Sequence, residues 1–189
     1  RHNDLLFMKI AVVGGGAAGF FSALAAKENF PHAQVCIYEK AGRLLSKVMI
    51  SGGGRCNLTH ACPTVDELCA AYPRGGRKLK KAFHIFNNSH TCAWFEVRGV
   101  PLVVQDDGCV FPASQKSQSI IDCFLREAKN LGVTVNCAVG VTTVSPNSNG
   151  LELSYDVPGR MPEVFDKVIV ASGGSPKREG LHWLEALGH

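Results

Sequence analysis

Three glycines and a glutamate near the start of the chain have the spacing needed to hold a dinucleotide. Gly14, Gly16 and Gly19 form a G-x-G-x-x-G motif, and Glu39 follows twenty residues after Gly19. In this motif one glycine makes a tight turn, the next lets the backbone approach a pyrophosphate, and the third lets a helix pack on a strand. A carboxylate at the position of Glu39 accepts hydrogen bonds from ribose hydroxyls. The spacing therefore predicts a dinucleotide site.

The glycines need a strand before them and a helix after them, and the sequence supplies both. Residues 8–13 form a run that is apolar except for Lys9, which is typical of a parallel strand buried on both faces. A helix is predicted from Ala17 to about Asn29, followed by a second strand over Gln34–Tyr38. We expect the diphosphate at the start of this helix, where unpaired N–H groups and the helix dipole favour an anion and where Ala17 and Ala18 add no bulk.

A second glycine-rich stretch, Ser51–Asn57 (SGGGRCN), follows the acid. Arg55 and Asn57 supply hydrogen-bond donors beside glycine backbone that can approach a ligand closely. We predict a ligand-binding role for this stretch and expect the apolar residues Val48–Ile50 to anchor it. The alternative is a flexible surface turn.

The rest of the chain continues the alternation of helices and strands. Thr64 and Glu67 form a capping-box signature, and 83–98 is typical of helices interrupted near 87–89. The whole order predicts an α/β fold, a Rossmann-like FAD- or NAD(P)-binding domain with a parallel sheet, flanking helices and a small antiparallel crossover β-hairpin. The other predicted elements are a strand–turn–strand over Pro101–Ala113, a helix over Ser114–Leu131, a strand over Val133–Cys137, a hairpin of Val139–Val144 and Leu151–Val157, a strand over Val164–Ala171 and a helix from about Glu179 to Leu187.

Length and charge narrow the class of protein. The 189 residues, 46% of them hydrophobic, suffice for one domain with a full core. A formal net charge of +4 is too small to indicate a nucleic-acid partner, so the basic run Arg74–Lys81 is interpreted as a solvated loop and helix start rather than an anion site. No apolar run is long enough to span a bilayer, and the first ten residues lack signal-peptide features. We expect a cytoplasmic protein with a small-molecule substrate and no membrane partner.

The cysteines and histidines give no clear catalytic or metal-binding pattern. The eight cysteines form no C-x-x-C pair, which favours reduced thiols. Cys56 and Cys62 lie where a redox pair could stand, but five residues separate them rather than four, and we favour unlinked thiols. With His60 they supply only three metal ligands, so no metal is predicted. His60, His84 and His90 have no partner at fixed spacing, and the catalytic residues stay unassigned.

Four motifs together resemble a known family. The combination resembles the HI0933-like family of bacterial flavoproteins, which includes enzymes called aminoacetone oxidases and has an FAD domain of the glutathione-reductase type. The resemblance runs from Met8 across the chain. It implies noncovalent FAD, with NAD(P)H as a candidate electron donor. The motifs are GGGAAG (Gly14–Gly19), SGGGRCN (Ser51–Asn57), DDGCVFPAS (Asp106–Ser114) and ASGGSP (Ala171–Pro176).

The resemblance also implies where FAD is bound. The first glycine motif would line the diphosphate, Glu39 would bind the adenosine ribose, and the second glycine-rich stretch would approach the diphosphate and the flavin. Val141 would offer its backbone to adenine. The full set of implied cofactor-binding residues is Gly14, Gly16, Ala17, Ala18, Gly19, Glu39, Lys40, Arg43, Ser51, Gly52, Gly53, Arg55, Cys56, Asn57, Val141, Ala171, Gly173 and Gly174.

The function implied is that of an FAD-dependent oxidoreductase acting on an unidentified small molecule. Some family members are linked to the reduction of steroid-like enones and others to amine oxidation, and this sequence does not choose between them. We expect residues 1–7 to be an upstream or added segment and 8–189 to be the N-terminal part of the FAD domain. The inserted substrate domain and final cofactor-binding segment of the family would then be absent, leaving this portion inactive alone. The alternatives are a non-catalytic dinucleotide-binding module (a sensor or an RNA-modification partner) and a disulfide reductase using Cys56 and Cys62.

Overall fold

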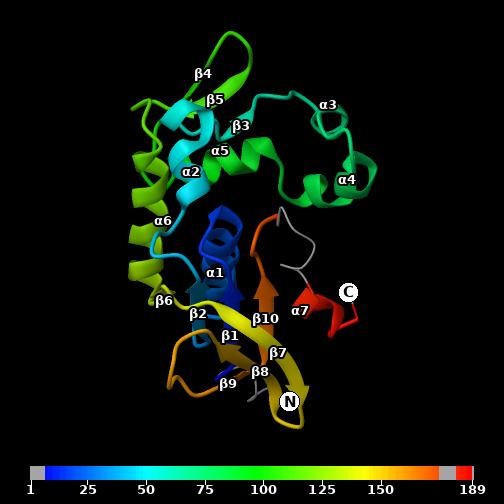
Figure 1. Cartoon of the computed structure of the whole chain (residues 1–189). Coiled ribbons are helices and arrows are strands. Elements are labelled where there is room, and N and C mark those ends of the chain that lie inside the picture. Colours follow the sequence, from blue (N-terminus) through cyan, green and yellow to red (C-terminus); the bar gives the residue numbers. More distant parts are fainter. Residues whose placement is uncertain (1–6, 175–181, 189) are drawn as a thin grey trace. The chain divides into compact units, whose positions relative to one another are not determined.

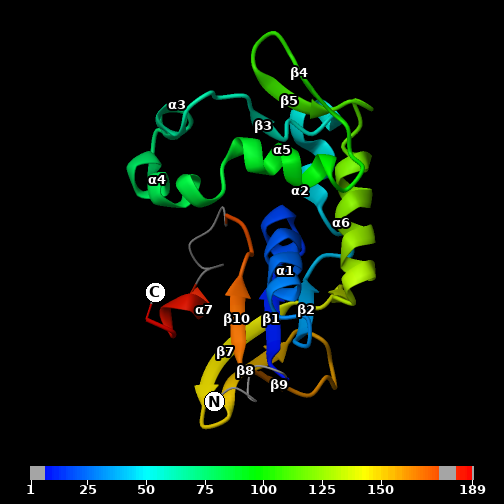
Figure 2. The ribbon, with the colours of Figure 1, turned by 180° about the vertical axis from the view of Figure 1, so that it is seen from behind.

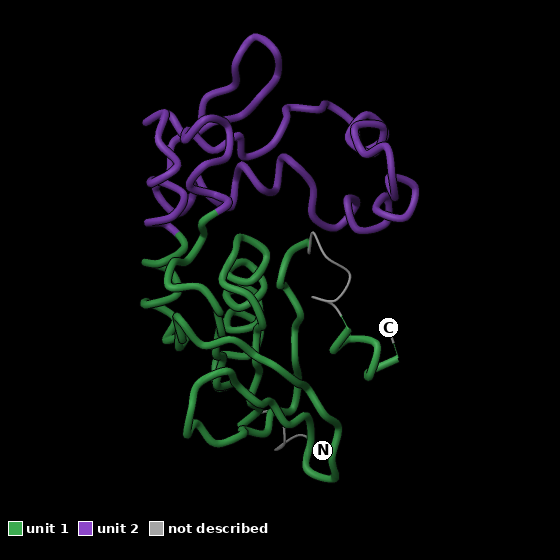
Figure 3. Tube along the Cα trace, in the orientation of Figure 1, with its two compact units in different colours: residues 1–46, 124–189 green, residues 47–123 purple. Residues whose placement is uncertain are grey.

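The computed structural model describes residues 7–174 and 182–188. The chain divides into two compact units, coloured separately in Figure 3. Unit 1 combines residues 1–46 and 124–189, and unit 2 consists of residues 47–123. Unit 1 is therefore built from both ends of the chain.

Unit 1 is organised around a parallel sheet of four strands with the order β10-β1-β2-β6 (Figure 1). Val13, the last residue of β1, pairs with Val170 on one side and with Tyr38 on the other. The carboxyl ends of three strands therefore lie together at one edge of the sheet. The strands are β1 (Lys9–Val13), β2 (Gln34–Glu39), β6 (Thr134–Cys137) and β10 (Lys167–Val170).

Alternate residues of the parallel strands enter two different cores, as the two-residue period of a strand requires. Ala11 and Tyr38 pack with Leu153 and Phe165 of a second, antiparallel sheet. The opposite face is covered by α1 (Ala17–Asn29), whose Phe20 and Leu24 are fully buried. Figures 1 and 2 show α1 on one face of the parallel strands and the antiparallel sheet on the other. The predicted fold class is confirmed.

The antiparallel sheet, of order β7-β8-β9, confirms the crossover hairpin and corrects one prediction. The strand predicted over Val164–Ala171 is two strands that belong to different sheets. Asp166 separates them: it exchanges backbone and side-chain hydrogen bonds with Lys9, and the chain leaves one sheet and enters the other there. The strands are β7 (Val141–Asn147), β8 (Gly150–Tyr155) and β9 (Glu163–Phe165).

Two helices differ from their predicted extents. The helix α6 (Gln118–Leu131) begins four residues later than predicted, since Gln115 has a φ of 56° that an α-helix excludes. Its residue Leu125 is 37% exposed, whereas Cys123 is buried. The final helix α7 (His182–Glu185) lies within the predicted range, whose residues 179–181 fall outside the described residues.

Unit 2 contains a three-stranded antiparallel sheet of order β3-β5-β4 and several short helices. The predicted capping box is confirmed, because the Thr64 hydroxyl accepts a hydrogen bond from the N–H of Glu67 at the start of α3. The predicted interruption near 87–89 is also confirmed, with Asn87 capping α5. Within 7–174 and 182–188, no helix is both long and apolar enough to cross a membrane. The elements are α2 (Ser46–Ile50), a 3-10 helix (Ser51–Gly54), β3 (Thr59–His60), α3 (Val65–Ala70), α4 (Gly76–Ile85), α5 (Asn88–Glu96), β4 (Leu102–Val104) and β5 (Cys109–Pro112).

Candidate cofactor-binding site

The first glycine motif forms a tight connection between β1 and α1. Gly14 has a φ of 116°, and its N–H donates to the carbonyl of Tyr38 at 2.8 Å. A Cβ atom on Gly14 would clash with the carbonyl oxygen of Ala171, and one on Gly19 would clash with the carbonyl oxygen of Gly14. Gly14 thus allows the turn and Gly19 allows the helix to pack against it, as the motif predicts.

Gly16, the N-cap residue of α1, is open where the other two glycines are crowded. A Cβ atom built on Gly16 meets no heavy atom within 4 Å. No side chain caps this helix end, and its first turn contains no acidic residue. The first N–H groups of an α-helix have no partner inside the helix, and they carry the positive end of its dipole. This end of α1 has the space and the charge to accept a phosphate group.

Glu39 holds the glycine loop in place. One oxygen of its carboxylate, Oε2, accepts a hydrogen bond from the N–H of Gly15 at 2.8 Å, and the other, Oε1, accepts one from the N–H of Ala41 at 2.8 Å. A carboxylate has about four lone-pair sites, so each oxygen keeps capacity for a further donor. Glu39 can therefore position the loop and still accept hydrogen bonds from a ligand.

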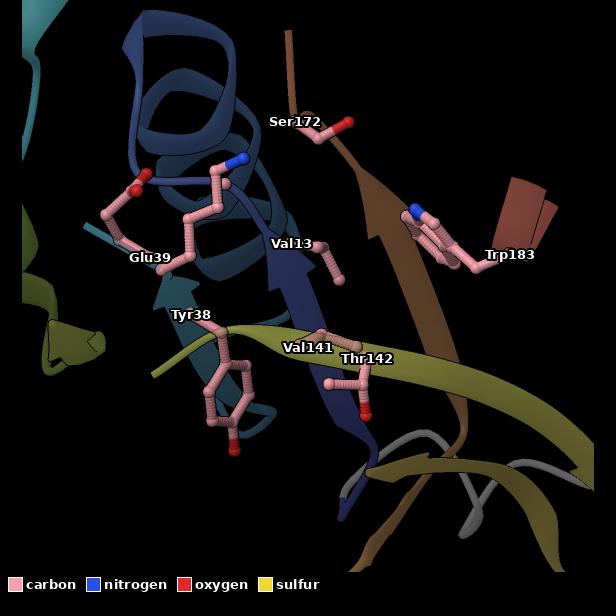
Figure 4. Close-up of a pocket in the computed structure, with 9 residues that line it drawn as sticks. Val13, Tyr38, Glu39, Val141, Thr142, Ser172 and Trp183 are labelled. Carbon is pink, nitrogen blue, oxygen red and sulfur yellow. The ribbon is translucent and has the colours of Figure 1, made fainter. Parts of the chain in front are cut away.

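A cavity of about 380 Å³ lies at the carboxyl edge of the parallel sheet (Figure 4). Four residues of its lining were predicted to bind cofactor, namely Gly14, Glu39, Lys40 and Val141. In Figure 4 Glu39 and Trp183 lie on opposite sides of this space, with Val13 between them and Ser172 above. The residues that sequence reasoning missed are Val13, Tyr38, Thr142, Ser172 and Trp183.

An irregularity in β7 makes main-chain groups available at this cavity. Val141 pairs with Tyr155 and Thr143 pairs with Ser154, so the register shifts and Thr142 has no opposite residue in the ladder. An extra residue of this kind leaves backbone groups outside the sheet hydrogen bonds. The irregularity lies next to Val141, whose backbone was predicted to contact adenine, and Thr142 is the residue at the irregularity itself.

Tyr38 forms a rigid wall below the cavity. Its ring lies 5.0 Å from that of Tyr155 and 6.0 Å from that of Phe165, and its hydroxyl donates to Glu163 at 3.4 Å. Arg160 binds the same carboxylate at 3.1 Å. Burial, with smaller contributions from neighbouring groups, raises the pKa of Tyr38 to about 12. The phenol is therefore neutral at physiological pH and acts as a structural group.

The remaining predicted residues of unit 1 lie on the same edge or on the adjoining loop. The N–H of Ala171 donates to the carbonyl of Val13 at 2.8 Å, which continues the sheet by one residue. Gly173 has a φ of 72°, and both it and Gly174 are exposed. Arg43 is exposed on the loop after β2. The structure brings Ala171 into contact with the glycine turn, whereas Arg43 does not line the cavity.

The second glycine-rich stretch is ordered by its own hydrogen bonds in unit 2. Gly52 and Gly53 have φ values of 55° and 68°. A Cβ on Gly52 would lie 2.6 Å from the nitrogen of Asn57, whereas one on Gly53 would meet nothing within 4 Å. The Arg55 guanidinium lies 4.3 Å from the ring centroid of Phe111. Gly53 is thus the open position of this stretch, as Gly16 is of the first.

The prediction that Val48–Ile50 anchors the second glycine-rich stretch is wrong. Ile50 is 74% exposed, so Val48–Ile50 does not fix it by burial. Ser117 does so through hydrogen bonds, since its N–H donates to Gly54 and its hydroxyl donates to Met49, each at 2.8 Å. Asn57 adds a contact from its amide to the Cys109 sulfur at 3.4 Å.

His60 has a structural role in unit 2. Its Nε2 lies 2.9 Å from the carbonyl oxygen of Asp107, and its Nδ1 lies 3.3 Å from the Cys62 sulfur. Gly108 makes room for the imidazole, because a Cβ there would lie 2.5 Å from the ring. Across the described part of the chain, no group of three or more potential ligands is arranged to hold a metal ion.

Cys56 and Cys62 are both free cysteines, and Cys56 is 5% exposed. Burial raises the pKa of the Cys56 thiol, and a hydrogen bond from Ser51 offsets this only in part. At about pH 8 we expect iodoacetamide to modify Cys56 at least about tenfold more slowly than the exposed Cys137, because the thiolate is the reactive form. The rate at Cys56 should rise as pH increases toward its raised pKa.

Peptide mass spectrometry after timed alkylation measures both cysteines in one sample. Equal alkylation rates at Cys56 and Cys137 would contradict the burial of the Cys56 thiol. A reducible Cys56–Cys62 link in oxidised protein would instead favour the disulfide-reductase alternative.

The parallel sheet, its glycine turn and the acid after β2 define a Rossmann-type dinucleotide-binding fold. Residues 8–187 match the family model described as the HI0933-like protein Rossmann domain. The chain belongs to this family, and the resemblance predicted from its motifs is confirmed.

Two curated proteins are similar to this chain. A 3-dehydro-bile acid delta(4,6)-reductase from Clostridium scindens is 28% identical over 170 residues, which cover 90% of this chain and 40% of that protein. A ribosomal RNA dihydrouridine synthase from Escherichia coli is 28% identical over 169 residues, covering 86% of this chain and 38% of that protein. The chain thus spans about two fifths of the length of these relatives.

Solved structures share the fold. A flavocytochrome c3 fumarate reductase superposes with a TM-score of 0.64 at 24% identity, covering 89% of this chain and 34% of that one. An E. coli quinol fumarate reductase gives a TM-score of 0.63 at 14% identity, covering 89% and 33%. Family and fold together support a flavoprotein of the oxidoreductase type.

Proposed function

We propose that this chain is the FAD-binding part of an oxidoreductase. The observation that carries the proposal is the open N-terminus of α1 at Gly16, next to a cavity that contains Glu39. The site has room for a diphosphate, an acceptor for ribose hydroxyls and main-chain groups for a base. These are the requirements of the ADP half of a dinucleotide.

The proposed roles follow from this geometry. The first N–H groups of α1 would bind the diphosphate, and Glu39 would accept hydrogen bonds from the adenosine ribose. The irregular backbone at Val141 and Thr142 would contact the adenine ring, with Trp183 beside it. We assign the second glycine-rich stretch, with Gly53 open and Arg55 and Asn57 as donors, to the flavin side of the cofactor.

The bound flavin would supply transfer of a hydride or of single electrons, while the protein binds, orients and shields it. Among the described residues that line the cavity, Tyr38 has a raised pKa and stays a neutral structural group near neutral pH, so it is not assigned as a general acid or base. Catalytic residues are therefore left unassigned. We propose a small-molecule substrate, with NAD(P)H as candidate donor.

The two curated relatives favour different substrate classes. The name of one refers to a bile acid and that of the other to ribosomal RNA. RNA modification is thus a second candidate function. It differs from the alternative drawn from the sequence, which was a non-catalytic module that partners RNA modification. Turnover assays with NAD(P)H and either a steroid enone or ribosomal RNA, on a protein that spans the full length of these relatives, would distinguish the two.

Titration with FAD tests the cofactor assignment directly. We expect bound flavin to give visible absorbance bands after removal of free FAD, and to quench the fluorescence of Trp183, which lines the cavity. The chain has only one other tryptophan, Trp94, which lies in unit 2. The variant Trp94→Phe isolates the Trp183 signal, and Trp183→Phe is the matched control. Absence of flavin bands after reconstitution would overturn the proposal.

A further inference from the structure

The helices α3 and α4 of unit 2 form a pair that presents a basic face to solvent. Gly76 allows the two helices to approach, because a Cβ there would clash with the carbonyl oxygen of Cys69. Tyr72 and Phe83 add a ring contact with centroids 5.4 Å apart. Gly76, Leu79 and Phe83 occupy positions i, i+3 and i+7 of α4, so its apolar side faces α3.

The opposite side of α4 carries positive charge. Arg77, Lys78 and Lys81 lie within an arc of about 100°, since 3.6 residues make one turn. All three are exposed, as is Arg74 in the turn before the helix. We call these four residues, Arg74, Arg77, Lys78 and Lys81, the cationic α4 face.

The charges of this face are not neutralised inside the unit. Asp66, the acid that reaches α4, forms a hydrogen-bonded salt bridge with Lys80, which lowers the pKa of Asp66. Over the ranges that the structure describes, no salt bridge involves a residue of the cationic α4 face. The cationic α4 face thus places four cations without a salt-bridge partner among the described residues within eight positions of the sequence. The local density of positive charge there is far higher than the net charge of +4 for the whole chain suggests.

Aromatic rings flank the same helix. Tyr72 precedes it and is 45% exposed, and Phe86 follows it and is 36% exposed. The ring of Phe86 is stacked with that of His90 at 5.7 Å. Cations that contact phosphates, with exposed rings on which bases stack, are the two features by which proteins bind single-stranded nucleic acid.

We propose that the cationic α4 face binds single-stranded nucleic acid through its phosphates, with Tyr72 and Phe86 contacting bases. Leu79 and Phe83 on the apolar side of α4 are partly buried against α3, which leaves Ile85, 75% exposed, rather than a continuous apolar face to meet a lipid surface. This favours a soluble polyanion over a membrane. The inference stands apart from FAD binding and differs from the interpretation of Arg74–Lys81 as a merely solvated segment.

Fluorescence anisotropy with a labelled oligouridylate of about 15 nucleotides tests the proposal on the full chain. We expect binding that weakens steeply between about 50 mM and 200 mM salt. The triple variant Arg77→Gln/Lys78→Gln/Lys81→Gln should bind at least about tenfold more weakly. Its slope of log K against log salt should be shallower by about 2, because each phosphate that is no longer neutralised reduces the slope by about 0.7.

Matched variants separate this site from general charge. The variant Lys116→Gln/Lys129→Gln/Lys167→Gln removes the same charge from exposed positions elsewhere and should retain the native affinity. The charge-preserving Lys78→Arg/Lys81→Arg should also bind normally. Circular dichroism checks that each variant is folded.

Three results would overturn the proposal. The first is the absence of salt-dependent binding by the unaltered chain, which needs no variant. The second is an equal loss of affinity in the two glutamine triples. The third is binding to anionic phosphatidylglycerol vesicles without binding to the oligonucleotide.

Discussion

Replacing Gly19 with alanine is expected to destabilise the chain by about 3 kcal/mol, at the upper end of the cost of overpacking. The added Cβ would overlap the carbonyl oxygen of Gly14, which is backbone and cannot move aside as a flexible side chain can. Either α1 must shift away from β1 or the glycine turn must change. Chemical denaturation monitored by circular dichroism measures the loss.

Gly16→Ala is the matched control within the same motif. Its Cβ meets nothing within 4 Å and its φ of −91° suits alanine, so the loss of stability should not exceed about 1 kcal/mol, the cost of alanine at an N-cap position. FAD affinity should nevertheless fall at least about tenfold, or about 1.4 kcal/mol, because the methyl group occupies the space assigned to the diphosphate. Native FAD affinity in Gly16→Ala would refute that assignment, and native stability in Gly19→Ala would refute the packing role.

Replacing Glu39 with alanine is expected to have two separate effects. The N–H groups of Gly15 and Ala41 lose their acceptor, which should lower the free energy of unfolding by about 1–3 kcal/mol. Loss of the acceptor for ribose hydroxyls should weaken FAD binding by a further about 1–3 kcal/mol. Calorimetric titration at a temperature where the variant is fully folded separates affinity from stability.

Glu39→Gln provides the comparison. Its amide keeps one acceptor oxygen and presents an NH₂ donor to the second backbone N–H, so we expect intermediate losses. A destabilised Glu39→Ala variant with native FAD affinity would assign Glu39 to the loop alone and remove it from the ribose site.

Local patterns predicted the part of the fold between Met8 and Glu39 well. The apolar run, the three glycines and the acid each impose a short-range requirement, and β1, α1 and β2 meet all of them. Prediction failed where a distant contact decides the structure. Ser117 fixes the second glycine-rich stretch through a hydrogen bond to Met49, although the two residues are 68 positions apart in the sequence. The sequence near Val48–Ile50 contains no pattern that predicts this contact.

The residues of the candidate site likewise fall into two groups: those that a local motif predicts and those that only the tertiary structure brings to the cavity. Gly14, Gly16 and Glu39 belong to a motif, so their positions were predictable. Ser172 and Trp183 reach the cavity only because β10 pairs with β1 and because α7 packs on the same core. That arrangement depends on strand order, which adjacent residues do not encode.

The irregularity at Thr142 has a further consequence for how such a site can vary. A ligand recognised through main-chain N–H and C=O groups makes no demand on the identity of the side chain that carries them. Such a ligand would therefore not constrain the side chain of the exposed Thr142, provided that the extra residue in β7 is kept, whereas Val141 also packs against the core of unit 1. Part of a binding site can therefore persist while its sequence diverges. The number of residues in β7 is constrained, whereas the identity of the residue at the irregularity is not.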